Sequence, residues 1–247
     1  MREDLLRIDV DAEIRKLTGR RFKTPADYAV ELLKWAARQK PLRIDIDISS
    51  SRFELRYDGA AATAGTIRAL AALLDEDKPA DERHEALVMV EDEAPELLAA
   101  FSLGHAIVRI ASSQGGNAVA HELSRKRKAR RIEARDDERP GVEICGRGRD
   151  LRLERALLAE AARYSIAPVY VDGVRVNRGL LLDDAVVQLD LRNERLRGVV
   201  GLPIKSDLTR IVRLEHGIRA EEKVLPSVGG MILCAADEAD EHLSAVT

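Results

Sequence analysis

The sequence predicts an α+β fold, in which helical and extended segments occur in separate groups along the chain. Residues 44–57 alternate apolar and polar side chains at period two, which is typical of paired strands with one buried face. Residues 25–39 repeat apolar side chains at helical spacing. Residues 185–237 hold several strand-like runs without a helical pattern between them. Segregated segments of this kind favour antiparallel sheets covered by helices.

Composition limits the classes of function. The chain has 247 residues, which fits one large domain or a domain with a smaller module. Hydrophobic residues make up 45% and aromatic residues only 3%, so Leu, Val, Ile and Ala must build the core. The net charge of −3 with 34% charged residues indicates a solvated surface of mixed sign and argues against nucleic-acid binding by the molecule as a whole.

The cysteines and the N-terminal segment bear on the compartment. Cys145 and Cys234 are far apart and form no disulfide framework, so we expect a reducing cytoplasm. Residues 1–10 carry charges that include Arg2, Glu3, Asp4 and Arg7, and they lack the apolar region of a signal peptide. No run approaches the roughly 18 apolar residues of a membrane span, so we expect no membrane partner.

A helix with clear start and stop signals is predicted over residues 25–39. Thr24 can cap it, Pro25 suits the first helical position, and Asp27 can complete a capping box. Pro41 ends the helix. The remaining predicted elements are a hairpin over 44–57, a helix over 66–74, a polar loop over 75–84, a helix from 94 that breaks near Gly104, two or three strands over 117–147, a helix over 151–164, a hairpin over 168–177, and further strands over 185–237.

Four segments carry a resemblance to a known superfamily. They are VELLKWAARQKPLRIDIDI (30–48), YDGAA (57–61), FSLGHAIVRIAS (101–112) and RYSIAPVYVDGVRVN (163–177). In order and spacing, they resemble the nucleotide motifs of the gyrase, heat-shock-chaperone, histidine-kinase and MutL (GHKL) ATPases. The chain is most similar to the heat-shock-protein-90-like and MutL-like types.

The resemblance implies a fold and a division of the chain. Residues 1–180 would form a two-layer α/β sandwich of the GHKL ATPase type, with a mixed, mostly antiparallel sheet covered by helices. Residues 181–247 look like a small β-rich module, similar to the start of a transducer or middle domain.

The resemblance also assigns the ATP-site positions, and most of them have changed. Glu31 matches the general base that activates water. Trp35 stands where the family has the magnesium-binding Asn, and Arg38 replaces an Asp three residues later. Tyr57 falls where an Asp accepts the adenine amino group, and Ala61 replaces the second glycine. In a chain with these changes, Trp35 and Tyr57 are expected to be core aromatics.

Other positions would matter only if ATP binds. Asp58 could replace the adenine-binding Asp after a one-residue shift, although such a shift moves a side chain to the opposite face of a strand. Gly59 matches a motif glycine and Gly104 matches a lid glycine. Pro140-Gly141-Val142 stands where the family has a Gly-Thr pair, so the hydroxyl is lost.

Three hypotheses of function follow. The first is a degenerate pseudo-ATPase domain without a cofactor, acting as a protein-interaction, regulatory or scaffold protein through a protein partner or self-association. The second is a working chaperone-like ATPase that uses Mg²⁺, ATP and Glu31. The third is nucleic-acid association through the basic run Arg125–Arg131, which the acidic residues in 133–138 would oppose. No histidine has metal-ligand spacing, and His105 is expected to be a packed core imidazole.

Overall fold

A computed structural model gives the tertiary structure of the chain. The residues it describes are 12, 16, 22–103, 107–114, 117–124, 127–135, 138–145, 152–183, 185–193, 196–204, 208–226 and 233–238. Gly104 and His105 lie outside these ranges, as does Arg125 at the start of the basic run.

The larger of two sheets has eight strands in the order β5-β4-β3-β6-β2-β1-β7-β8. Only the β1–β7 pair is parallel, and every other pair is antiparallel. The strands are β1 (Ile44–Ile48), β2 (Arg52–Tyr57), β3 (Ile107–Gln114), β4 (Asn117–Ser124), β5 (Arg127–Ile132), β6 (Gly141–Cys145), β7 (Val169–Val171) and β8 (Val174–Arg175).

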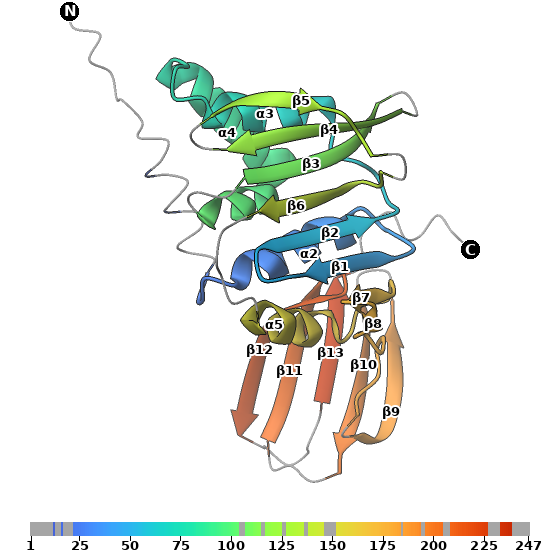
Figure 1. Cartoon of the computed structure of the whole chain (residues 1–247). Helices are drawn as coiled ribbons and strands as arrows, with labels where there is room; N and C mark the ends of the chain where they lie inside the picture. Colours follow the sequence, from blue (N-terminus) through green and yellow to red (C-terminus); the bar gives the residue numbers. More distant parts are fainter. Residues whose placement is uncertain are drawn as a thin grey trace, which may run out of the picture.

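Helices cover one face of this sheet and leave the other open (Figure 1). The described helices are α2 (Asp27–Arg38), α3 (Ala64–Leu74), α4 (Ala80–Glu93), the 3-10 helix η1 (Pro95–Leu103) and α5 (Arg152–Ala162). The fold is therefore mixed α+β with a large, mostly antiparallel sheet, as the segregated sequence pattern predicts. The loop expected over 75–84 is shorter than predicted, because α4 already begins at Ala80 and places acidic residues in its first turn.

Helix α2 begins two residues later than expected. Its start signals are used only in part: the Thr24 hydroxyl and N–H donate to Asp27 Oδ1 at 2.7 Å and Oδ2 at 2.9 Å, but the N-cap residue is Ala26, and Thr24 does not cap the helix as predicted. One face of α2 is fully buried, including Tyr28, Leu32 and Trp35. The helix therefore owes its position to packing on the sheet rather than to its polar cap.

Helix α2 packs on the β1–β2 hairpin. Ile46 pairs with Leu55, and Ile44 pairs with Tyr57, so these apolar side chains point to the helix-covered face. Gly141 lets β6 approach β2 closely, because a Cβ at this position would lie 2.1 Å from the Leu55 carbonyl oxygen.

A second sheet of five strands follows, in the order β12-β11-β13-β10-β9. Its strands are β9 (Ala185–Arg192), β10 (Leu196–Pro203), β11 (Leu208–Glu215), β12 (Ile218–Pro226) and β13 (Leu233–Glu238). The four strand runs that the sequence indicates in this region, AVVQLDL, LRGVVGLPI, RIVRLEHG and GMILCAAD, correspond to β9, β10, β11 and β13. Strand β12 is not among them, because its charged residues hide the apolar alternation. One face of the sheet buries Val199, Val212 and Leu214 together with Tyr164 and Leu182.

The turn between β11 and β12 joins the second sheet to the first layer. Ile218 is fully buried within the core formed by the helices and the large sheet. Gly217 precedes it with φ of +80°, a conformation that glycine adopts without strain. Arg219 then pairs with Glu160 of α5. One inserted side chain and its neighbours therefore attach β11 and β12 to the helical layer.

Truncating Ile218 tests this attachment. We expect Ile218→Ala to lower the free energy of unfolding by about 2–5 kcal/mol, because it leaves a cavity in the main core. The matched control is Ile211→Ala on the same pair of strands, where the side chain is 38% exposed. It should cost less than about 1 kcal/mol. Equal losses in urea unfolding would contradict the assigned role of Ile218.

Candidate functional site

Two aromatic side chains fill the space between α2 and the end of β2. The Trp35 and Tyr57 rings meet edge to face, with centroids 5.2 Å apart and planes at 90°. Trp35 is 1% exposed and Tyr57 is fully buried. The Tyr57 hydroxyl donates to the Ala60 carbonyl at 2.8 Å, and burial raises the pKa of this phenol. Neither ring offers a metal ligand at this place.

Glu31 lies one helical turn before Trp35 and faces the second sheet. Its carboxylate accepts from the Lys34 ammonium at 2.8 Å. Lys34 also reaches Glu215 of β11 at 3.1 Å. Burial alone would lower the pKa of Lys34, but the two carboxylates outweigh burial and raise it. Burial would raise the pKa of Glu215, and Lys34 lowers it instead. Lys34 and Glu215 are therefore both held in their charged forms.

A polar pocket of about 410 Å³ opens around this bridge. It lies between α2, the start of η1 and the turn that follows β11. Its lining residues are Glu31, Lys34, Pro95, Glu96, Arg213, Glu215, His216 and Ala220. Both signs of charge alternate around its wall, and much of that charge is already paired within the chain.

The other positions with motif counterparts have structural partners. Arg38 donates to the Glu93 carbonyl at 2.7 Å and pairs with Glu96 at 3.0 Å, which joins α2 to the α4–η1 junction. Asp58 is exposed and accepts the Arg43 N–H at 2.8 Å, which closes the base of the β1–β2 hairpin. Gly59 packs against the end of α2, since a Cβ there would lie 2.7 Å from the Gln39 carbonyl oxygen.

Ala61 is half-buried in the segment between β2 and α3. The structure thus gathers Glu31, Trp35, Arg38 and Tyr57 around α2. Asp58, by contrast, is exposed while its neighbour Tyr57 is buried.

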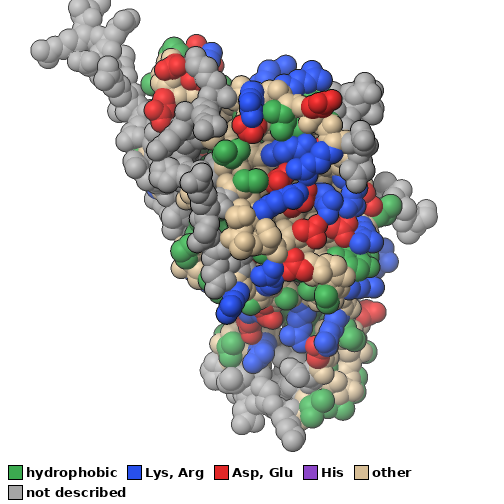
Figure 2. Space-filling model, viewed as in Figure 1, with side chains coloured by type: hydrophobic (Ala, Val, Ile, Leu, Met, Phe, Trp, Pro, Cys, Tyr) green, Lys and Arg blue, Asp and Glu red, His purple; other side chains and the backbone are tan. Residues whose placement is uncertain are grey.

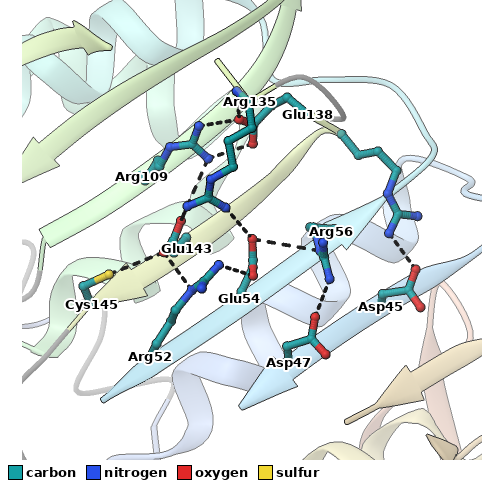
Figure 3. A network of polar contacts seen from close by, with 11 residues as sticks. Asp45, Asp47, Arg52, Glu54, Arg56, Arg109, Arg135, Glu138, Glu143 and Cys145 are labelled. Carbon is teal, nitrogen blue, oxygen red and sulfur yellow. Dashed lines mark hydrogen bonds and ion pairs between the residues drawn. The ribbon is translucent and has the colours of Figure 1, made fainter. Parts of the chain in front are cut away.

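The open face of the large sheet carries a network of ion pairs (Figure 3). Strand β2 contributes Arg52, Glu54 and Arg56 on the side opposite Phe53 and Leu55. Arg52 reaches Glu143 of β6 at 2.8 Å. Figure 2 shows positive and negative side chains interleaved over this face. Neighbouring strands hold each charge next to its opposite, so the network carries little net charge.

A segment between β5 and β6 folds back over this face and completes the network. Arg135 bridges Glu54 at 3.0 Å and Glu143 at 2.7 Å. Glu138 accepts two hydrogen bonds from Arg109 of β3, the longer at 2.7 Å. Arg139 pairs with Asp45 of β1 at 2.9 Å.

The network lowers the pKa values of two of its carboxylates, those of Asp45 and Glu138. Burial alone would raise the pKa of Asp45, but hydrogen bonds from Arg43 and Arg139 outweigh burial and lower it. Glu138 behaves in the same way, because Arg109 and the Arg135 N–H outweigh its burial and lower its pKa. Both groups are therefore held ionised in the folded protein.

The basic run ends on β5, which forms one edge of the large sheet. Arg130 is 67% exposed and pairs with Glu122 of β4 at 3.0 Å. Arg131 is exposed opposite His121, whose pKa is lowered by burial and by this guanidinium. Glu138 pairs with Arg109 of β3 instead, so it does not oppose the run as the sequence suggested.

Two negative findings apply to the described part of the chain alone. Within it, no group of three His, Cys, Asp or Glu side chains is placed to hold a metal ion. None of its helices has the length and apolar character needed to cross a bilayer.

Comparison with known proteins adds no relative. No protein-family model matches the chain, and no curated protein matches it in sequence. The resemblance to GHKL ATPases is therefore a prediction that rests on the motifs themselves.

Several residues of these sites were not singled out from the sequence. Lys34 is far in the chain from Glu215 and His216, and only the docking of the second sheet brings it beside them. The ion-pair network left a readable signal: Arg52, Glu54 and Arg56 alternate with apolar residues, which indicates a charged strand face.

The aromatic contact predicts a large effect on stability. We expect Trp35→Ala to cost about 3–5 kcal/mol of unfolding free energy, because the indole fills the centre of the core. Tyr57→Phe keeps the ring and removes only the hydrogen bond to Ala60, so it should cost about 0.5–1.5 kcal/mol. Chemical denaturation measures both variants. A Trp35→Ala protein as stable as Tyr57→Phe would show that the ring contact is unimportant.

Acid should weaken the fold through the ion-pair network. The folded pKa values of Asp45 and Glu138 lie below their unfolded values, so the unfolded chain binds more protons in that range. Stability is fully present above the ordinary carboxyl pKa of about 4 and is lost as pH falls through the folded values. Asp45→Asn should flatten this dependence in pH-resolved unfolding. Asp47→Asn is the control, since Asp47 is 51% exposed and should change the slope little.

Proposed function

We propose that this chain is a degenerate GHKL-type domain that binds no nucleotide and acts as a protein-interaction, regulatory or scaffold module. The observation that carries the proposal is the contact between Trp35 and Tyr57. The resemblance puts magnesium and adenine recognition at these two positions, and both side chains are instead buried against each other.

The space between α2 and β2 is energetically better filled by the two aromatic side chains than opened for a nucleotide. A nucleotide between α2 and β2 would have to displace an indole and a phenol from the core, at a cost of several kcal/mol. It would gain no metal ligand from Trp35 in return. The paired state of Glu31 points the same way, because its carboxylate supports Lys34 and the second sheet.

The arrangement of layers also supports the proposal. A mostly antiparallel sheet with helices on one face, followed by a smaller sheet, agrees with the division into residues 1–180 and 181–247 that the resemblance implies. In this proposal the fold serves to bind protein partners, or a second copy of the chain, through its surface.

The alternative, an ATPase that uses Glu31, requires more rearrangement. Asp58 would have to exchange its hydrogen bond with Arg43 for one with adenine, and another group would have to hold Mg²⁺. Nucleic-acid binding through β5 has some support from the exposed Arg130 and Arg131. Arg130 already pairs with Glu122, which reduces the charge available to phosphates.

Nucleotide titration tests the proposal directly. Trp35 is the single tryptophan of the chain, so its fluorescence reports on this place alone. We expect Mg²⁺–ATP to leave the emission unchanged and to give no heat of binding in calorimetry.

Tight magnesium-dependent binding of ATP would overturn the proposal. Glu31→Ala then separates the alternatives: if the chain is an ATPase, this variant loses turnover, whereas unchanged background hydrolysis excludes catalysis by Glu31.

A further inference from the structure

The four outer edges of the two sheets differ in how they are protected. Exposed edge strands pair readily with other chains, and proteins block them with charge, proline or short length. The edge strand β5 is rich in Arg and Lys, and β8 has only two residues. The edge strand β12 carries four charged residues and ends at Pro226.

Strand β9 lacks most of this protection. It has eight residues, AVVQLDLR, and four of its apolar side chains are exposed to solvent. They are Val186 (66%), Val187 (52%), Leu189 (63%) and Leu191 (36%). Among the described residues, no strand pairs with its outer side. A bulge at Leu202/Pro203 interrupts only the start of β9, so residues 187–192 form a regular edge.

The hydrogen-bond pattern shows which backbone groups face outward. The Asn193 N–H donates to the Leu196 carbonyl at 2.9 Å, so this pair is hydrogen-bonded. Hydrogen-bonded pairs alternate along an antiparallel ladder, which directs the backbone of Leu189 and Leu191 toward β10. The backbone N–H and C=O groups of Gln188, Asp190 and Arg192 therefore point away from the sheet.

We propose that β9 pairs antiparallel with β9 of a second copy of this chain, centred on Leu189, so that the two five-stranded sheets become one. In this register Leu189 lies opposite Leu189 of the second copy, and Val187 lies opposite Leu191. These apolar positions fall on non-hydrogen-bonded pairs, where side chains are closest.

The pattern of exposed apolar side chains selects this register and favours a second copy as the occupant. With the two-fold axis at Leu189, the exposed apolar side chains of this face meet one another, and Asp190 lies opposite Gln188, whose amide is already held within its own chain. Centring on Leu191 would pair Asp190 with Arg192, but it would carry Val187 past the end of the partner's strand. Centring on Asp190 would set two like charges opposite each other. Centring on Gln188 would set Asp190 against Val186 at the bulge. The strand is therefore complementary to itself in one alignment.

The inference names a partner for the interaction role proposed above and rests on that role. The two are tested separately, because oligomeric state reports on the pairing and nucleotide titration reports on the role. A monomeric chain would overturn the pairing alone, and nucleotide binding would overturn the role alone.

Light scattering after size exclusion, on the full chain, is the first test. The wild type should be a dimer. Asp190→Pro should be a monomer, because it removes an outward N–H and leaves the ladder with β10 intact. Leu202→Lys is the matched control: it changes an apolar residue of the same sheet face on β10, away from the edge, and should remain a dimer. A monomeric wild type, or a dimer that persists in Asp190→Pro, overturns the pairing.

Cross-linking keeps the proposal falsifiable if Asp190→Pro fails to fold. In a chain with Cys145 and Cys234 replaced by serine, Leu189→Cys should form a disulfide-linked dimer on oxidation. Its Cα atoms would lie about 4.5 Å apart across the axis, within disulfide range. Val187→Cys should not cross-link, since Val187 faces Leu191 of the other chain. Equal cross-linking of both variants, or of neither, overturns the register.

Discussion

Edge-to-face packing between α2 and the β1–β2 hairpin is the contact on which the rest of the structure depends. Tyr28 meets Phe53 with centroids 5.5 Å apart, and Trp35 meets Tyr57 at 5.2 Å, two helical turns further on. In a chain with 3% aromatic residues, these four side chains are a large share of the aromatic core. They fix both the distance of α2 from the sheet and its rotation about its own axis, since each ring pair tolerates only a narrow geometry.

The position of α2 in turn determines which residues its polar side chains contact. With Trp35 turned inward, Glu31 and Lys34 face the second sheet and receive Glu215. Ile218 then enters the main core beside them. Among the described residues, the buried Ile218, the Arg219–Glu160 pair and the bridge from Lys34 to Glu215 thus join the second sheet to the helical layer. An aromatic core on one side of α2 and an ionic contact on the other leave the helix with a structural role.

The two faces of the large sheet differ in the side chains that they carry. The helix-covered face is apolar, whereas the open face pairs arginines with carboxylates across neighbouring strands. The segment bearing Arg135 and Arg139 shields that network, so its charges are partly desolvated and interact more strongly than isolated surface pairs. In the described part of the second sheet there is no such network near β9, where apolar side chains remain in contact with solvent.

The sequence by itself determined the local elements and the α+β class, because hydrophobic period and capping residues act within a few positions. It predicted the hairpin over 44–57, the helix at Thr24–Asp27 and the turn at Asp172-Gly173, where Asp172 and Gly173 both have positive φ. It missed β12, whose charges mask the strand period, and the start of α4. The tertiary structure alone decided that Trp35 touches Tyr57, that Lys34 meets Glu215 and that β9 is an unprotected edge. Those facts depend on strand order and on contacts between distant segments, which no local pattern encodes.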